Sequence, residues 1–349
     1  MKSRLRSWLV VSEAIALFIA LASATSAQDR RYPLPPAPSV AAHTTQQPSA
    51  HGQSQPNSKQ ADYTFVELDP LGQGAGYCYV DAHAINNAGQ VVVDWSDPAD
   101  CNVLHASLWD KGQWTSLDAV DPNCPGLATY LTSLNDRGIA FGTYWGYCPY
   151  QPAGGVFVKN GKWFLFPDIP GFPYNQGFSM SNNGLAVGTA SDADFAAFKH
   201  WLWTGNQYSF FTFPPNWDVN DWWAGPLFIN DSGRIAGQFW DSAAGGRRRA
   251  YVLDGSKLTV LDAPGNPVRT GVNGINTAGD VLVIGRYVED GTSYPASFSW
   301  RKGVFMPLPN VPFAGAVETY VYGLNNRGDI SGIWIDGSDL THAFVAIRR

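Results

Sequence analysis

Short runs of apolar residues follow one another along residues 61–349, and one phrase separates them at a nearly constant spacing. The phrase is an apolar residue, Asn (Ser181 in the third copy), a polar residue, any residue and Gly. It occurs six times, at 85–89, 134–138, 180–184, 229–233, 275–279 and 324–328. Its glycines are 49, 46, 49, 46 and 49 residues apart. An internal period of this length is typical of one blade of a β-propeller.

Each repeat predicts four short strands. An apolar run follows the phrase, as in Val91–Val93, and the Asn and Gly suit a tight hairpin whose Gly takes the left-handed conformation. A second hairpin is expected about 23 residues downstream, at Gly112, Gly161, Gly205, Gly255 and Gly303. No stretch of the repeats keeps a helical period over a useful length, so the fold class is all-β.

The two ends of the repeat region predict how the ring closes. Only five copies of the second hairpin exist, and the outer strand of the sixth blade is missing at the C-terminal end. Residues 64–72 resemble residues 258–265, which form such an outer strand. We therefore expect a six-bladed β-propeller of four-stranded blades, in which the N-terminal strand completes the last blade. Closure protects the strand edges; an open solenoid is the alternative.

The segment before the repeats predicts export. Residues 1–27 combine a basic start, an apolar stretch from Ala14 to Ala22 and a cleavage point after Ala24 or Ala27, which is the pattern of a signal peptide. An uncleaved anchor is the alternative. Residues 28–60 are rich in Pro, Gln and Ser, which is typical of a disordered linker. We expect a secreted or periplasmic protein with no membrane span after cleavage.

Composition and charge narrow the partners. The chain has 36 glycines, 14% aromatic and only 15% charged residues, as suits many short strands joined by tight turns. Its net charge is −6, and removal of the signal peptide would make it more negative. An acidic chain without a basic stripe argues against nucleic acid. The one basic run, Arg247–Arg249, is interpreted as a solvated strand edge rather than a binding patch.

The four cysteines predict two disulfides. All lie in the first two repeats, two in each, at Cys78, Cys101, Cys124 and Cys148. In an up-and-down blade the loops that carry them share one face, which favours pairing within each repeat; the other pairings remain open. A zinc site is the alternative, but no Cys-x-x-Cys pair is present. We expect no metal and no cofactor.

The repeat resembles the HAF repeat of extracellular bacterial proteins. The His-Ala-Phe triplet occurs at 342–344, and residues 105–109 are close to it. The Asn-x-x-Gly phrase followed by apolar residues and a second Gly is the other half of the pattern. The first and fifth repeats depart from it at Val93 and Val283. The resemblance implies an exported propeller-like protein, and it transfers no functional residue.

Aromatic residues in the longer loops are the candidate ligand-binding residues. These loops share the face opposite the tight turns, where a rigid scaffold presents variable segments. Flat rings beside Asp and Asn suit sugar faces and hydroxyls, although each ring could instead pack between blades. The candidates are Trp95, Trp145, Tyr147, Trp217, Asp221, Trp222, Trp223, Trp240, Tyr287 and Trp334.

Three functions fit these patterns. The first is an exported binding module for a glycan or another extracellular ligand. The second is a carbohydrate-active hydrolase or lyase, for which Asp81, Asp221 and Glu318 face the right side but no catalytic pair can be named. The third is a protein-interaction or envelope scaffold. No nucleophile-elbow or zinc-protease motif occurs, so we expect a monomeric binding protein rather than an enzyme.

Overall fold

The computed structural model describes residues 63–72, 77, 79–97, 100–118, 128–145 and 153–349. They belong to one compact unit, Asp62–Arg349. The predicted signal peptide and linker lie outside the described residues and stay predictions. Within the part of the chain that is described, no helix has the length and apolar character needed to cross a membrane.

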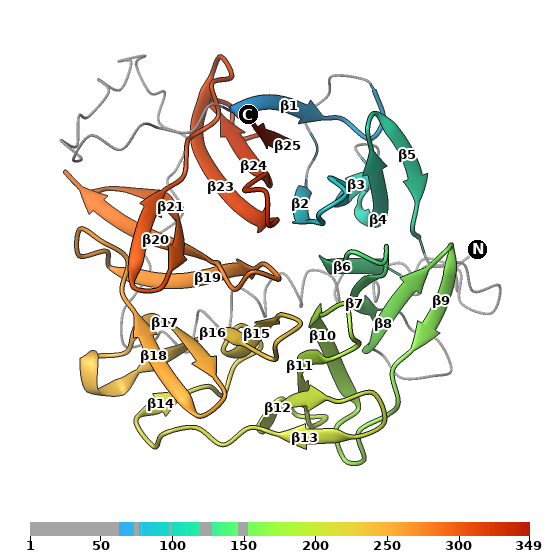
Figure 1. Ribbon diagram of the computed structural model, residues 1–349, viewed down its shortest axis with the longest axis vertical. Helices are drawn as coiled ribbons and strands as arrows, with labels where there is room; N and C mark the ends of the chain where they lie inside the picture. The colour runs from blue at the N-terminus through green and yellow to red at the C-terminus, as the bar shows by residue number, and fades with distance from the viewer. Residues whose placement is uncertain (1–62, 73–76, 78, 98–99, 119–127, 146–152) are drawn as a thin grey trace, which may run out of the picture. The chain divides into compact units, whose positions relative to one another are not determined.

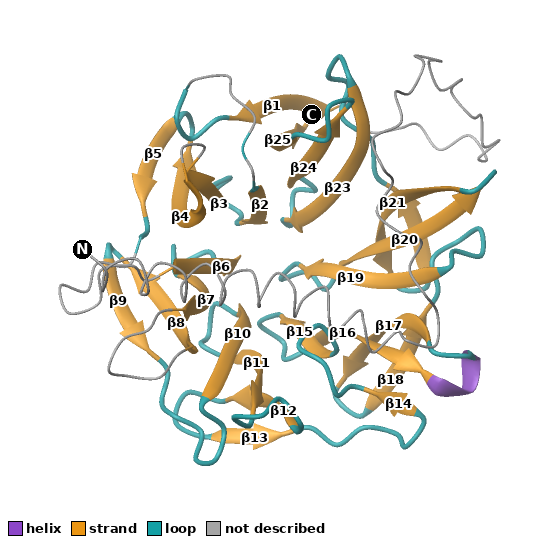
Figure 2. Ribbon diagram, turned by 180° about the vertical axis from the view of Figure 1, so that it is seen from behind, coloured by secondary structure: helices purple, strands orange, loops and turns teal. Residues whose placement is uncertain are grey.

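The all-β prediction is confirmed: the unit is a ring of six antiparallel blades (Figures 1 and 2). Blades 1 and 2 consist of β2 (Val80–Ile85), β3 (Val91–Asp97), β4 (Asp100–Asp110) and β5 (Gln113–Ser116), then β6 (Ala128–Leu134), β7 (Ala140–Trp145), β8 (Ala153–Lys159) and β9 (Lys162–Leu165). Blades 3 and 4 consist of β10 (Tyr174–Met180), β11 (Ala186–Ser191), β12 (Phe198–Trp203) and β13 (Tyr208–Phe210), then β15 (Gly225–Ile229), β16 (Ile235–Asp241), β17 (Arg247–Asp254) and β18 (Lys257–Leu261). Blades 5 and 6 consist of β19 (Arg269–Ile275), β20 (Val281–Glu289), β21 (Thr292–Arg301) and β22 (Val304–Pro307), then β23 (Ala316–Leu324), β24 (Ile330–Asp336), β25 (Thr341–Arg348) and β1 (Tyr63–Leu68).

The first strand in the sequence completes the sixth blade, as the repeat count predicts. β1 pairs antiparallel with β25 along its whole length, from Tyr63 opposite Arg348 to Leu68 opposite Ala343. Figure 1 shows the blue β1 beside the red strands of the same sheet. Two additions depart from the plain four-stranded scheme: β14 (Trp217–Asp218) pairs with β16, and one bridge joins β8 to β10.

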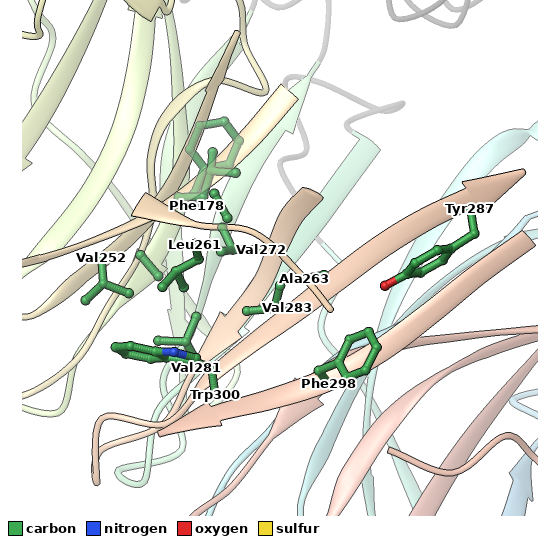
Figure 3. Close-up of a cluster of buried hydrophobic side chains, with 13 residues drawn as sticks. Phe178, Val252, Leu261, Ala263, Val272, Val281, Val283, Tyr287, Phe298 and Trp300 are labelled. Carbon is green, nitrogen blue, oxygen red and sulfur yellow. The ribbon is translucent and has the colours of Figure 1, made fainter. Parts of the chain in front are cut away.

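Apolar side chains fill the spaces between neighbouring blades. One cluster joins β17 and β18 of blade 4 to β19, β20 and β21 of blade 5, and includes Val252, Leu261, Val272, Val281 and Trp300 (Figure 3). Similar clusters lie between the other blades. Successive side chains of one strand enter the two neighbouring clusters in turn: Val91 and Val93 of β3 belong to the cluster shared with blade 6, and Val92 to the cluster shared with blade 2.

The repeated Asn-x-x-Gly phrase forms the tight turn between the first and second strands of each blade. All six glycines have a positive φ, between +68° and +86°, which side-chain-bearing residues rarely adopt. In five blades the Asn Oδ1 accepts a hydrogen bond from the backbone N–H four residues later. These residues are Asn86, Asn135, Asn230, Asn276 and Asn325.

The same asparagines link the blades around the axis. Each Nδ2 donates to the backbone carbonyl of the equivalent residue in the next blade, at 3.0–3.3 Å, and Asn325 donates to Asn86 across the ring closure. Ser181 has no amide, and here Asn183 donates to the backbone carbonyl of Asp231 instead. We call this end of the molecule the turn face and the opposite end the loop face.

Candidate functional site

Most of the predicted aromatic residues pack into the blades. Trp222 and Trp334 are buried, with ring edges or faces against Phe198 and His342. Tyr287 is buried and stacks on Tyr294. These three rings therefore pack within the propeller, which is the alternative that the sequence left open.

Two further candidates are also held in ring contacts. Trp217 stacks on Phe239 with the ring centroids 3.6 Å apart. Trp95 stacks on His105 at 4.4 Å and donates from Nε1 to Ser107. Of Trp145 only the backbone, at the end of β7, is described, and Tyr147 lies outside the described residues.

Three of the candidates meet on the loop face of blade 4. Asp221 accepts from the backbone N–H of Trp223 at 3.2 Å and from Nε1 of Trp240 at 3.3 Å. Trp223 is 39% exposed, whereas its neighbour Trp222 is 7% exposed. The Trp223 backbone carbonyl accepts from the side chain of Gln238, which ties the loop to the innermost strands.

A cavity of about 220 Å³ is lined by residues of blades 4, 5 and 6. Arg248, Arg269, Arg286, Tyr320 and Ile284 line it, and we call it the arginine pocket. All five lining residues are partly exposed. The pocket is smaller than the roughly 300–1,000 Å³ of a drug-sized site, so it suits one ring or one polar group of a ligand.

Arg248 and Arg249, from the basic run interpreted as a solvated strand edge, have different environments. Along β17 the side chains alternate, and Arg249 forms ion pairs with Asp241 and Asp262. Arg248 instead lines the pocket, with its guanidinium 5.9 Å from the ring centroid of Trp240. The interpretation of the whole run as an edge was therefore wrong for Arg248, because the strand period sends it to the opposite side from Arg249.

A glycine on β19 makes room for side chains of blade 4. A Cβ on Gly271 would lie 2.7 Å from Oε1 of Gln238, which is a clash, and 3.5 Å from Nη2 of Arg248, which is ordinary contact. At the equivalent place on the innermost strands, blade 1 has Asp81 and blade 6 has Tyr320. The missing side chain in blade 5 therefore leaves space for Gln238, beside Arg248.

The pocket has an unusual charge balance. Burial, followed by the nearby positive charge of Arg269, lowers the pKa of Arg248 to about 10, while Asp221 opposes the shift. Arg248 remains a cation at neutral pH. On the other side, Arg286 donates to the Tyr320 hydroxyl, which donates to Glu318. The pocket therefore presents guanidiniums held by neighbours that position them.

A second group of titratable side chains lies in blade 1, on β2, on β3 and just before β2. His83 occupies the β-bulge of β2, with its Nε2 3.4 Å from Asp94 and 3.5 Å from Asp81. The Tyr79 hydroxyl donates to Asp81 at 2.7 Å. We call Tyr79, Asp81, His83 and Asp94 the axial cluster; the His83 ring also contacts Tyr130 edge-to-face.

Burial dominates the electrostatics of the axial cluster. It raises the pKa of Asp81 to about 7, with the Tyr79 hydrogen bond opposing, and lowers the pKa of His83 to about 3. It also raises the pKa of Asp94 well above its usual range. Asp94 Oδ2 accepts the Leu131 N–H, while its Oδ1 has no partner among the described residues. A carboxyl that holds its proton near neutral pH is a property of general acids.

The described residues contain no group of three His, Cys, Asp or Glu side chains arranged to hold a metal. Cys78, Cys124 and Cys148 lie outside the described residues, and of Cys101 only the backbone, in β4, is described. The two disulfides stay a prediction. On the turn face, a cavity of about 70 Å³ is lined by the asparagine turns, whose polar groups largely bond to one another.

The sequence pattern predicts Asp221, Trp223 and Trp240 as site residues, but it does not predict the arginine pocket. Arg269 and Arg286 are register partners on β19 and β20, and Arg248 comes from the neighbouring blade. No spacing rule connects residues of three blades. The available signal is that the innermost strand of blade 5 carries Gly271 where blade 1 has Asp81.

No protein-family model matches the chain, and no curated protein matches it. Solved structures of similar fold do. A mutant of AofleA from Arthrobotrys oligospora is 13% identical, with a TM-score of 0.46 over 84% of this chain and 88% of that chain. A Dyadobacter fermentans protein of unknown function is 10% identical, with a TM-score of 0.49 over 83% and 99% of the two chains. Trypanosoma rangeli sialidase is 9% identical, with a TM-score of 0.48 over 81% and 59%.

Proposed function

We propose that the protein is an exported binding module that holds a glycan on its loop face, over Trp223 and beside the arginine pocket. The observation that carries the proposal is the contrast between Trp223 and its neighbours. Most of the candidate rings on this face are packed, whereas Trp223 is 39% exposed, and Asp221, which accepts its backbone N–H, is close enough to Arg248 of the pocket to influence the pKa of that residue. An exposed indole has a hydrophobic cost that a ligand can relieve.

The surroundings of Trp223 suit a sugar. The C–H groups of a pyranose ring pack on an indole face, while its hydroxyls need hydrogen-bond donors and acceptors at the edge. Asp221 lies beside Trp223, and guanidiniums and the Tyr320 hydroxyl line the neighbouring pocket. The predicted signal peptide supports an extracellular ligand, since it would deliver the propeller outside the cytoplasm.

The test is a depletion assay of the purified full chain against insoluble and soluble polysaccharides. Depletion without shortened polysaccharide chains supports the binding module. Absence of depletion across the whole panel contradicts it, and favours the scaffold, whose aromatic residues would be structural.

A second candidate is a carbohydrate hydrolase, favoured by one observation. Asp81 is a carboxyl whose pKa is raised to about 7 by burial, as in a general acid. New reducing ends in the depletion assay, lost in Asp81→Asn, support this candidate. Intact polysaccharide chains after prolonged incubation contradict it.

A further inference from the structure

The arginine pocket brings like charges together in a protein that is acidic overall. Arg248 and Arg269 are close enough for the charge of one to lower the pKa of the other. The chain as a whole has a net charge of −6. Two carboxylates offset these charges in part, since Asp221 opposes the pKa shift of Arg248 and Glu318 lies 3.7 Å from Arg286, and a ligand anion in the cavity would offset them further.

Arg248 has hydrogen-bonding capacity that its protein neighbours do not use. Its Nε is buried without a hydrogen-bond partner among the described residues. Its closest aromatic neighbour, Trp240, offers only a ring face. A guanidinium has five N–H donors in a planar fork, and a buried donor without a partner costs free energy that a ligand oxygen would recover.

The opposite wall supplies positioned donors. Arg286 donates from Nε to Ser293 at 2.7 Å and from Nη1 to Tyr320. These bonds fix the guanidinium, so little side-chain entropy is lost when a ligand binds. The cavity between the two walls, about 220 Å³, admits one small group.

We propose that the arginine pocket binds the anionic group of an acidic glycan, a carboxylate or a sulfate ester, while the sugar lies toward Trp223. This inference rests on the proposed function and names the ligand class of the same site. Carboxylates and sulfates match the guanidinium fork with paired, charge-assisted hydrogen bonds. A neutral glycan would offer no anion to the Arg248 guanidinium, whose Nε has no partner among the described residues.

The experiment compares matched pairs of polymers with the purified full chain. The first pair is polygalacturonate and its fully methyl-esterified form; the second is dextran sulfate and dextran. We expect the wild-type protein to bind at least one charged polymer about tenfold to a hundredfold more tightly than its neutral counterpart, the range of one or two charged hydrogen bonds. The pair that shows the difference identifies the anionic group.

Two variants test whether the preference for the charged polymer depends on the arginine pocket. Arg248→Gln removes one guanidinium, and Ile284→Phe narrows the cavity without changing the charge. Both should abolish the preference for the charged polymer. The control is Arg137→Gln, which makes the same charge change at an exposed arginine of the turn face and should keep the preference. If Arg248→Gln does not fold, Arg269→Gln and Ile284→Phe carry the same test.

The outcomes separate the inference from the proposed function. Equal binding of charged and neutral polymers overturns the inference and leaves the binding module standing. A preference that survives both pocket variants also overturns it, because the anion then binds elsewhere. If no polymer binds, the proposed function fails. In that case the monosaccharide galacturonate decides the pocket itself: thermal stabilisation of the wild type but not of Arg248→Gln supports an anion site, and its absence overturns it.

Discussion

Two consecutive tryptophans on the loop face lie in opposite environments. Trp222 is buried against Phe198 and Phe195, whereas Trp223 is 39% exposed and contacts Phe178. The first ring fastens the loop to blade 3. The second is left available on the surface, so one dipeptide combines packing and recognition.

Alanine substitutions should separate these two roles. We expect Trp222→Ala to lower the free energy of unfolding by about 3–5 kcal/mol, the usual cost of a buried aromatic ring. We expect Trp223→Ala to change it by less than about 1 kcal/mol and to lose glycan binding. Denaturant unfolding and the depletion assay measure both. Binding that survives Trp223→Ala in a folded protein contradicts the placement of the sugar.

Near pH 5, folding changes which of the two side chains Asp81 and His83 is protonated. Near pH 5 in the unfolded chain, Asp81 is ionised and His83 is protonated. In the folded protein the pKa of Asp81, about 7, and the pKa of His83, about 3, reverse this. The two residues together bind one proton in either state, so their effects on the pH dependence of stability cancel between about pH 4 and 6.5.

Single substitutions at Asp81 and His83 should reveal two opposite dependences of the free energy of unfolding on pH. In Asp81→Asn the contribution of His83 remains, and the free energy of unfolding should rise with pH, relative to wild type, by about 1.4 kcal/mol per pH unit in that window. In His83→Gln the contribution of Asp81 remains, and the relative slope should be negative and of similar size. Asp94 is common to all three proteins. Unfolding titrations between pH 4 and 6.5 that give both variants the same relative slope contradict this account.

The sequence predicted the aromatic part of the candidate site but not the arginine pocket, and the difference has a physical reason. Loop aromatics are visible in a sequence, and Asp221, Trp223 and Trp240 do meet. The period of 49 and 46 residues says which positions are equivalent, but not which rings are buried. The partial burial of Trp217 depends on its contact with Phe239 of the paired strand, and the space beside Arg248 depends on the absence of a side chain at Gly271.

At the scale of the elements, the turns between first and second strands form a continuous hydrogen-bonded ring with one exception. Each asparagine secures its own turn and the next blade, and Ser181 performs only the first of these functions through its hydroxyl. The repeated phrase predicted the turns because a positive φ at Gly leaves a clear sequence signal. The bonds between blades could not be predicted, since they depend on how close the turns lie around the axis.

Completing the ring should stabilise the protein. In Ser181→Asn the new amide can donate to the backbone carbonyl of Asn230, as its equivalents do in five blades, and we expect a gain of about 0.5–1.5 kcal/mol. Asn325→Ala is the opposite change. It removes one of the donors that cross the ring closure and leaves buried groups without partners, so we expect a loss of about 2–4 kcal/mol. Denaturant midpoints that move in the same direction for both variants contradict the proposed role of the ring.

At the scale of the whole molecule, one strand joins the two ends of the repeat array. Leu68 of β1 is buried with Val80 and Val91 of blade 1 and Ala343 and Val345 of blade 6. The missing hairpin and the similarity of residues 64–72 to 258–265 were sufficient to predict this pairing. β1 thus belongs to blade 6 and also packs against blade 1.

The closure predicts a contrast between two positions of β1. Leu68→Ala should cost about 2–5 kcal/mol, because it opens a cavity between blades 6 and 1. Val66→Ala, at an exposed position of the same strand, should cost less than about 1 kcal/mol. Thermal or denaturant unfolding checks both. Equal effects at the two positions contradict a role of β1 in sealing the ring.

The pairing of β1 with β25 also sets an order of events during synthesis. Tyr63 leaves the ribosome early, and its register partner Arg348 follows 285 residues later. Until then β1 has no strand to pair with. Blades 1 to 5 can therefore fold before blade 6, which needs β25. The ring is therefore closed only after β25 has emerged, and a chain cut short before β25 lacks both a partner for β1 and a closed sixth blade.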